Sequence, residues 1–321
     1  MLPDAIIKNQ LKRTLDSTNF KIGKKYEGKV RDNYSFDGKR LIITTDRISA
    51  FDRVLCTIPF KGQVLNQISA FWFEKTKKIM KNHVIGVPDQ NAMLVKECKP
   101  CPVEMIVRGY ITGVTTTSAW YNYERGVRNF CGNILPEGLK KNQKFDKPII
   151  TPTTKAVHGM HDESISRDEI IKRGLVDEKI YRKMEKAALE LFAFGTGLVA
   201  KNNLILVDTK YEFGTLNNEL VLIDEIHTPD SSRFWIKDTY KELFSKGKEP
   251  QKLDKEYVRQ WLSNKGFIGD GTIPKIPDEI KIEAAKRYIQ AYEMITGKEF
   301  TAKNEDILRR IEKNIGKSFM F

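Results

Sequence analysis

The sequence has no long hydrophobic run. No uninterrupted apolar stretch approaches the roughly 18 residues that a membrane-spanning helix requires. The first residues, MLPDAIIKNQLKRTL, contain no apolar core followed by a small-residue cleavage site. The hydrophobic content of 40% and the aromatic content of 10% are ordinary for a globular chain. We therefore expect a cytoplasmic globular protein with no membrane partner.

Cysteines are also scarce. The chain of 321 residues has four of them, and Cys98 and Cys101 form the single CxxC pair. A structural zinc site needs a complete set of thiolate or imidazole ligands, and no second pair or suitably spaced histidine partner accompanies CKPC. We expect Cys56, Cys98, Cys101 and Cys131 to be free thiols in a reducing compartment.

The chain lacks the usual signatures of nucleic-acid binding, although its formal net charge is +13. There is no arginine-rich tract, no zinc knuckle and no aromatic-basic RNA-binding motif. A basic protein can neutralise nucleic-acid phosphates, or it can carry solvated lysines and handle small anionic substrates. Because the lysines are spread along the whole chain, the second interpretation is favoured and we expect no nucleic-acid partner.

Hydrophobic periodicity predicts an alternation of short strands and helices with no flexible linker between halves. The length fits two lobes, or one large unit with an added domain. We expect short strands over 22–61, an amphipathic helix over 63–82 and a second helix over 177–201. The pattern is helical again after residue 250, where DEIKIEAAKRYIQAYEMITG runs from an aspartate cap to a glycine stop.

Two further segments carry local signals. AMLVKEC and VEMIVRGY are predicted strands separated by KPCP, because proline cannot donate to a strand ladder. Residues 131–165 have little periodicity and are rich in Gly, Pro, Thr and His, which is typical of a functional loop. This segment leads into SRDE, Ser166 to Glu169, a capping box that begins a helix.

A predicted hairpin carries an unusual density of acids. Strand alternation puts Asp208, Lys210 and Glu212 on one face, and the returning strand of LIDEIHTPDSSRFW brings Asp224. Asp224 shares that face if the loop has an odd number of residues or a bulge, whereas a strict two-residue turn would put it on the other face. Paired carboxylates suit Mg²⁺. A solvated face in which Lys210 pairs the acids is the alternative, but the polar run ending at Arg233 favours a site.

Near the N-terminus, EGKVRDNY joins a glycine turn to Lys29 and Arg31. Glycine lets backbone approach a phosphate, and the two cations would neutralise it. The segment is neither a Walker loop nor a GxGxxG fingerprint. Taken alone, the segment is more typical of a hairpin with basic side chains than of a phosphate site.

Six motifs in order are more specific than any one of them. Together they closely resemble the phosphoribosylaminoimidazole-succinocarboxamide synthase (SAICAR synthetase) family. The motifs are GKVRDNY, TTDRISAFD, VEMIVRGYITG, TPTTKA followed by HGMHDESIS, LVDTKYEFG and LIDEIHTPDSSRFW.

The resemblance implies an α+β, two-lobed, ATP-grasp-like fold with antiparallel sheets and an added C-terminal helical region. The N-terminal lobe would span 1–105. The C-terminal lobe would span 106–321 and hold the substrate and metal sites, with the helical region beginning at about 250. The implied reaction joins carboxyaminoimidazole ribonucleotide (CAIR) to L-aspartate with ATP and Mg²⁺, giving SAICAR, ADP and phosphate in purine biosynthesis.

The resemblance also assigns roles to the ATP side. Lys29 and Arg31 match the family's phosphate-covering loop. Lys96 and the backbone near Cys98 match the segment that passes the adenine. Glu104 would contact the base or ribose, and a salt bridge at the core edge is an equal alternative for it. The catalytic hairpin residues are Lys210, Glu212 and Asp224, of which Glu212 and Asp224 would bind Mg²⁺.

On the substrate side, Arg108 and Arg233 match positions that hold CAIR, because a planar guanidinium suits bidentate capture of phosphate or carboxylate. We expect His161 to orient substrate by hydrogen bonding rather than to act as a general base. A turn-capping role is the alternative for Asp46. The substrate-side residues are Arg108, Ser118, Lys155, His161, Asp162, Arg233, Asp46 and Ser49.

One position departs from the family pattern. Many relatives place a phosphate-binding serine directly after VRGYITG, where this chain has Val114. Allowing a four-residue insertion, Ser118 supplies the matching hydroxyl. Thr115 is the alternative.

The implied chemistry passes through an acyl phosphate. Transfer of the γ-phosphoryl group of ATP to the CAIR carboxylate would make it reactive toward the aspartate amine, and catalysis would consist mainly of positioning and electrostatics. A kinase-like phosphotransferase acting on a small anionic substrate is the nearest alternative, and a basic RNA-binding protein is a more distant one. At the C-terminus, Ile307, Leu308, Ile311 and Ile315 form a helical stripe suited to packing on the body or on another subunit.

Overall fold

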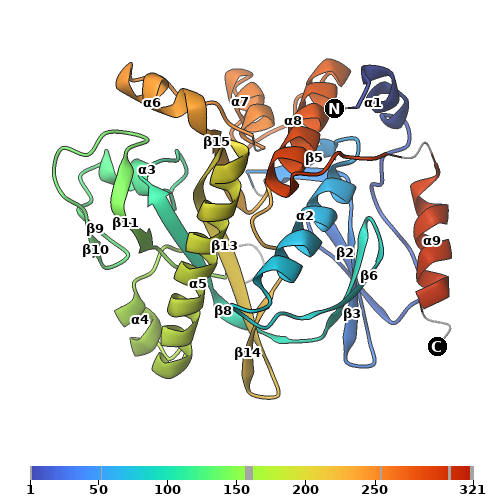
Figure 1. The fold of residues 1–321 in the computed structure, drawn as a ribbon, viewed down its shortest axis with the longest axis horizontal. Helices are drawn as coiled ribbons and strands as arrows, with labels where there is room; N and C mark the ends of the chain where they lie inside the picture. The colour runs from blue at the N-terminus through green and yellow to red at the C-terminus, as the bar shows by residue number, and fades with distance from the viewer. Residues whose placement is uncertain (1, 52, 156–161, 254, 303–304, 319–321) are drawn as a thin grey trace.

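The computed structural model describes residues 2–51, 53–155, 162–253, 255–302 and 305–318. Two antiparallel sheets dominate it, as Figure 1 shows. The first has the order β1-β2-β3-β7-β6. Helix α2 packs against this sheet. The bounds are β1 Lys24–Glu27, β2 Arg31–Phe36, β3 Lys39–Thr44, β6 Val84–Asp89, β7 Ala92–Lys96 and α2 Lys61–Thr76.

The second sheet has the order β11-β8-β13-β14, with β12 also on β8 and β15 on β13. Helix α5 crosses its β8 and β13 strands. Because α2 and α5 contribute to one hydrophobic cluster, the core runs continuously under both sheets. The bounds are β8 Lys99–Tyr110, β11 Lys144–Ile150, β12 Thr153–Thr154, β13 Leu204–Leu216, β14 Glu219–Ile223, β15 Ser232–Ile236 and α5 Glu178–Val199.

The remaining elements are short strands and helices around these layers. Helices α7 and α8 lie together, α8 packs on α2, and α9 packs on β6. No helix in the described part of the chain is long and apolar enough to cross a membrane. The bounds are α1 Asp4–Gln10, β4 Arg47–Ala50, β5 Arg53–Thr57, α3 Ala119–Tyr123, β9 Asn129–Phe130, β10 Asn133–Ile134, α4 Arg167–Lys172, η1 Ala200–Asn202, α6 Lys237–Ser245, α7 Glu256–Asn264, α8 Asp278–Thr296 and α9 Ile307–Ser318.

The predicted helix starts are confirmed by their caps. Ser166 accepts a hydrogen bond from the amide of Glu169 at 3.2 Å, as the capping box requires. The Asp177 carboxylate accepts from the amide of Lys179 at 2.9 Å and begins α5. Gly297 ends α8 with a φ of 68°, although α8 begins after Pro277 rather than after an aspartate cap.

The prediction that KPCP interrupts the strand is wrong. Strand β8 runs unbroken from Lys99 to Tyr110 through both prolines. Pro100 pairs with Gly214 directly after a register shift, and the carbonyl of Pro102 accepts from the amide of Lys155 at 3.1 Å. Proline fits there because a bulge and a carbonyl-only contact do not need its missing N–H.

The hairpin of β13 and β14 closes through a two-residue turn, so the expected odd loop or bulge is absent from it. Leu216 pairs with Glu219, and the turn residues Asn217 and Asn218 have φ values of 50° and 62°, as a type I′ turn requires. Glu212 therefore pairs with Ile223. Asp224 follows the strand with a φ of 66°, and this local departure from the ladder turns its side chain toward Lys210.

The C-terminal helix packs on the body of its own chain. Ile307, Ile311 and Ile315 are buried in a cluster that includes Tyr34 and Leu41 of the first sheet. Leu308, the fourth member of the predicted stripe, is 42% exposed. The apolar stripe is therefore largely covered within the subunit.

Candidate active site

Two cavities lie along the second sheet. The arginine cavity, of about 200 Å³, is lined by Arg108, Thr115, Ser118, Asp208 and Arg233 among others. The acidic cavity, of about 670 Å³, reaches toward the first sheet, and its lining includes Lys29, Arg31, Ser49, Glu104, Lys155, Asp162, Lys210, Glu212, Asp224 and Glu225. Lys210 lines both cavities, so they meet at its side chain.

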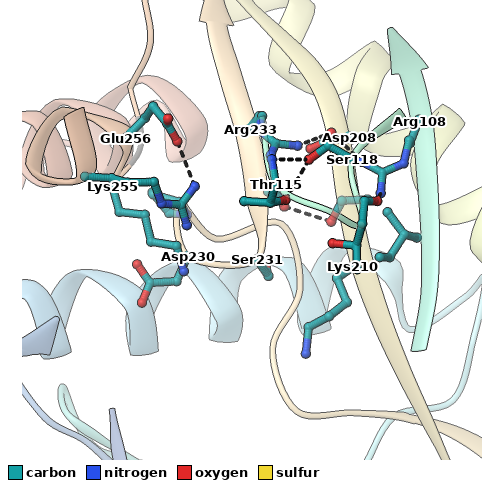
Figure 2. Close-up of a pocket in the computed structure, with 16 residues that line it drawn as sticks. Arg108, Thr115, Ser118, Asp208, Lys210, Asp230, Ser231, Arg233, Lys255 and Glu256 are labelled. Atoms are coloured by element: carbon teal, nitrogen blue, oxygen red, sulfur yellow. Dashed lines mark hydrogen bonds and ion pairs between the residues drawn. The ribbon is translucent and has the colours of Figure 1, made fainter. Parts of the chain in front are cut away.

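In the arginine cavity, two guanidinium groups share one carboxylate. Arg108 Nη1 lies 3.2 Å from Asp208 Oδ2, and Arg233 pairs with the same oxygen (Figure 2). Arg108 is held further by Thr151 Oγ1 at 2.7 Å and by the carbonyl of Thr117 at 2.8 Å. Because one carboxylate cannot neutralise two guanidinium groups, the cavity keeps a positive charge suited to an anion.

Both candidate hydroxyl groups lie in the arginine cavity. Ser118 Oγ and Thr115 Oγ1 are 2.7 Å apart, and Ser118 Oγ also accepts from the Thr115 amide at 3.3 Å. Gly113, with a φ of 94°, lies so close that a Cβ on it would overlap Ser118 Oγ. Ser118 and Thr115 therefore form a hydrogen-bonded pair on the cavity wall.

The acidic cavity interleaves carboxylates with cations. Lys210 Nζ lies 2.8 Å from Glu104 Oε1 and also pairs with Glu212. Lys155 pairs with the other oxygen of Glu212. Glu104 thus forms the salt bridge that the sequence offered as one of two roles, while it also lines the cavity.

Asp224 and Arg31 extend this charge network beyond Lys210. Arg31 pairs with Asp224 and, at 2.6 Å, with Glu225. Burial raises the pKa of Asp224 to about 7, with a further rise from repulsion by Glu212 and opposition from Arg31. Burial also disfavours the charged form of Glu212, but Lys210 and Lys155 outweigh it and hold the pKa of Glu212 well below its usual range.

Three predicted site residues lie elsewhere. Lys96 ends β7 and Cys98 lies in the short link to β8, and neither residue lines either cavity. Asp46 is fully buried, and its carboxylate accepts from the amides of Leu15 at 2.8 Å and Gly62 at 2.9 Å. The expected cleft position of Asp46 is therefore wrong, because it binds the first turn of α2 as the capping alternative held. His161 is outside the described residues.

Glu212 and Asp224 fit Mg²⁺ by donor chemistry. Mg²⁺ in nucleotide enzymes is held by one or two carboxylates together with substrate phosphates and water, and these two carboxylates line one cavity. Within the described residues, no group of three or more His, Cys, Asp or Glu side chains is arranged to hold a metal alone. The pair is therefore suited to an ion that arrives with a phosphorylated substrate.

Sequence reasoning missed several residues of the cavity walls. Strand alternation places Asp208 on the correct strand face, but the sequence assigns it no role. Asp230 forms an ion pair with the buried Lys61 at 2.8 Å and accepts from Tyr288 at 2.7 Å. Lys255 lines both cavities. Only the polar density of TPDSSR signalled any of these, because Lys61 and Tyr288 come from distant helices.

Fold and cavities together define an α+β enzyme in which an anion cavity opens onto a carboxylate-rich one. The SAICAR synthetase family model matches residues 24–274. A phosphoribosylaminoimidazole-succinocarboxamide synthase of Legionella pneumophila (strain Paris) is 47% identical over 310 residues, covering 94% of this chain and 99% of the relative. A chloroplastic synthase of Arabidopsis thaliana is 47% identical over 317 residues, covering 96% of this chain and 77% of the relative.

Solved structures agree. The SAICAR synthase from Saccharomyces cerevisiae complexed with SAICAR superposes with a TM-score of 0.78 at 33% identity, over 90% of this chain and 100% of that one. A type-2 SAICAR synthetase in complex with ADP gives a TM-score of 0.65 at 26% identity, over 87% and 100%. These matches place the chain among the ligases of purine biosynthesis. It belongs to the SAICAR synthetase family.

Proposed function

We propose that this chain carries out the reaction of its family, joining the carboxylate of CAIR to the amine of L-aspartate while ATP becomes ADP and phosphate. The observation that carries the proposal is the meeting of the two cavities at Lys210. A substrate held in the arginine cavity can extend its carboxylate to a nucleotide held in the acidic cavity. Two solved neighbours, one complexed with SAICAR and one with ADP, support this division.

The arginine cavity is proposed to hold the phosphate of CAIR. Arg108 and Arg233 supply forked donors, and Ser118 with Thr115 supplies hydroxyl groups beside them. Asp208 holds both guanidinium groups in place before the substrate arrives, which reduces the entropy cost of binding. The carboxylate end of CAIR then points toward Lys210.

ATP is proposed to occupy the acidic cavity, between two lobes of an ATP-grasp-like arrangement divided near residue 105. Lys29 lies on its wall and would neutralise the phosphates. Arg31 is proposed to exchange its contacts with Asp224 for the phosphates as well. The adenosine of ATP would lie beside Lys96, the backbone at Cys98 and Glu104. Glu212 and Asp224 would hold Mg²⁺, which when bound supplies positive charge to the phosphates.

The proposed chemistry has two steps. An oxygen of the CAIR carboxylate attacks the γ-phosphorus, the bond to the β-phosphate oxygen breaks, and ADP leaves with that electron pair. The aspartate amine then attacks the acyl carbon, the carbon–oxygen bond to phosphate breaks, and the amine loses a proton as the amide forms. Lys210 would neutralise charge on the transferring phosphoryl group. Glu104 and Glu212 hold the ammonium of Lys210 in position through their ion pairs with it.

Lys155, Ser49 and Asp162 line the acidic cavity and are proposed to face the reacting groups. His161 is proposed to orient substrate through a hydrogen bond. Asp46 has no proposed role in binding, because its carboxylate is occupied by backbone amides.

The test is ADP release by the purified protein with ATP, Mg²⁺ and CAIR, with and without L-aspartate. The proposal predicts release that depends on both CAIR and aspartate, with SAICAR formed in equal amount. Rapid release with CAIR alone would instead indicate the kinase-like phosphotransferase, and release that ignores CAIR would contradict both functions.

A further inference from the structure

The segment 224–228, between β14 and β15, faces the acidic cavity on one side and the core on the other. Asp224 and Glu225 line the acidic cavity, whereas Ile226 and His227 are fully buried. Within the described part of the chain, no backbone hydrogen bond joins these four residues to another segment. The position of Asp224 therefore depends on the side chains of its own segment rather than on the ladder of the sheet.

The backbone of this segment is strained at two positions. Asp224 has a φ of 66° and His227 has a φ of 48°, values in the left-handed region that non-glycine residues rarely adopt. Such conformations persist only where surrounding contacts hold them, and they concentrate at functional sites. The segment therefore needs an anchor.

The ring of His227 is that anchor, because three elements close around it. Its Nε2 atom is hydrogen-bonded to Tyr211 Oη of β13 at 2.6 Å. The ring of Trp72 from α2 meets the imidazole edge to face, with the ring centroids 4.6 Å apart. On α5, a Cβ at Gly195 would lie 2.4 Å from Cε1 of the imidazole, so glycine leaves the room that the ring occupies.

Stability alone does not account for a histidine at this position. Among the described residues, the buried Nδ1 of His227 has no hydrogen-bond partner, a cost that an apolar side chain of similar size would avoid. The buried Tyr211 hydroxyl is another polar group in the core, and its hydrogen bond goes to His227. What the polar pair provides is a directed link that fixes one arrangement of the segment against β13.

The hydrogen bond between Tyr211 and His227 connects the two strands of the carboxylate pair. Tyr211 lies between Lys210 and Glu212 on β13, and its buried side chain is on the opposite face from theirs, which line the acidic cavity. His227 belongs to the segment that carries Asp224. A shift of His227 away from Tyr211 would therefore change the spacing between Asp224 and Glu212.

We propose that His227 is a positioning residue, whose hydrogen bond to Tyr211 holds the Asp224 carboxylate at the spacing from Glu212 at which the two can share a metal ion that arrives with the nucleotide. This inference rests on the proposed function and adds to it two core residues that touch neither substrate nor metal. Because the bond acts on the spacing of the carboxylates, its loss weakens nucleotide binding only when the metal is present.

The test is calorimetric titration of the purified protein with ADP, once with Mg²⁺ and once with EDTA, in variants that break the bond from either side. Tyr211→Phe removes the hydroxyl and keeps the ring, and His227→Leu removes the imidazole. Both variants should weaken the binding of ADP with Mg²⁺ ~3- to 10-fold, the range for one buried hydrogen bond. The affinity for metal-free ADP and the KM for CAIR should stay within about twofold of wild type.

Two further variants separate positioning from stability. His227→Gln places an amide where it can still bond Tyr211, so it should retain most of the affinity for ADP with Mg²⁺. Tyr123→Phe is the matched control, because the buried Tyr123 hydroxyl donates to the carbonyl of Pro136 at 2.9 Å and Tyr123 lines neither cavity. It should lower the melting temperature and leave both ADP affinities unchanged.

Unchanged affinity for ADP with Mg²⁺ in Tyr211→Phe and His227→Leu would overturn the proposal. Equal weakening with and without the metal, or a loss in His227→Gln as large as that in His227→Leu, would overturn it in favour of core packing. If wild type binds ADP equally well with Mg²⁺ and with EDTA, the metal part of the proposed function is contradicted. If wild type responds to Mg²⁺ and the variants match it, only the role of His227 is contradicted.

Discussion

The ammonium of Lys210 lies 3.9 Å from Asp224 Oδ2, although strand register alone would turn Asp224 to the other face of the sheet. The positive φ of Asp224, 66°, brings the carboxylate back to the cavity after the strand ends. Holding a non-glycine residue there costs about 1 kcal/mol. A backbone strained in this way at a cavity wall is consistent with a role for Asp224 in function.

Asp224→Asn should abolish most turnover and leave the fold intact. The amide keeps the shape of the side chain but loses the charge that would bind Mg²⁺, and we expect kcat to fall by ~10²- to 10³-fold or more. Because burial already raises the pKa of Asp224 to about 7, loss of the charge should not lower the melting temperature. Kinetics and thermal unfolding of the same preparation check this, and a near wild-type kcat would falsify the metal role.

Arg233→Lys should weaken the binding of CAIR. Lysine keeps the charge but cannot present a fork of donors, so we expect KM for CAIR to rise ~10-fold or more with KM for ATP unchanged. Arg128→Lys is the matched control, because Arg128 pairs with Glu137 on the surface and lines neither cavity. Equal KM values for CAIR in wild type and Arg233→Lys would argue against the arginine cavity as the phosphate site.

Gly195→Ala should destabilise the protein. Gly195 lies on α5 where a Cβ would overlap the ring of the buried His227, and overpacking of a core costs about 1–3 kcal/mol. Gly197 is on the same helix with open space around it, so Gly197→Ala should be neutral or stabilising by about 0.5–1 kcal/mol. Denaturant unfolding measures the free energy of unfolding of both variants. Similar free energies of unfolding for Gly195→Ala and Gly197→Ala would contradict this prediction.

Stability should fall as the pH drops below about 6.5, the pKa of an unfolded histidine. Burial lowers the pKa of His227 to about 3 in the folded protein. Between about pH 6.5 and 3, His227 is therefore protonated in the unfolded chain and neutral in the folded one. The contribution of His227 is therefore complete above pH ~6.5 and is lost by up to ~1.4 kcal/mol per pH unit below it. Between pH 7 and 5, the free energy of unfolding should depend less steeply on pH in His227→Gln than in wild type. The same pH dependence in both proteins would refute this role of His227.

Sequence patterns predicted the features that depend on near neighbours. Strand alternation placed Lys210 and Glu212 on one face, and the caps at Ser166 and Asp177 marked the starts of two helices. The two-residue turn at Asn217 and Asn218 is one of the loop lengths that the sequence left open, and only the strand register decides between them.

Features that depend on distant partners could not be predicted in this way. Asp46 faces the core because two amides, from the N-terminal segment and from α2, converge on it. Asp230 is held by Lys61 and Tyr288, which lie far from it in the sequence. Alternation also ends where a strand ends, so it could not predict the turn that returns Asp224 to the cavity.

The most direct test of the proposed chemistry uses CAIR labelled with ¹⁸O in its carboxylate. If the carboxylate attacks the γ-phosphorus, the oxygen that bridges carbon and phosphorus leaves with the phosphate when the amine attacks. Mass spectrometry should then find one ¹⁸O in each phosphate released in the presence of ATP, Mg²⁺ and L-aspartate. Unlabelled phosphate formed together with SAICAR would contradict the acyl-phosphate route.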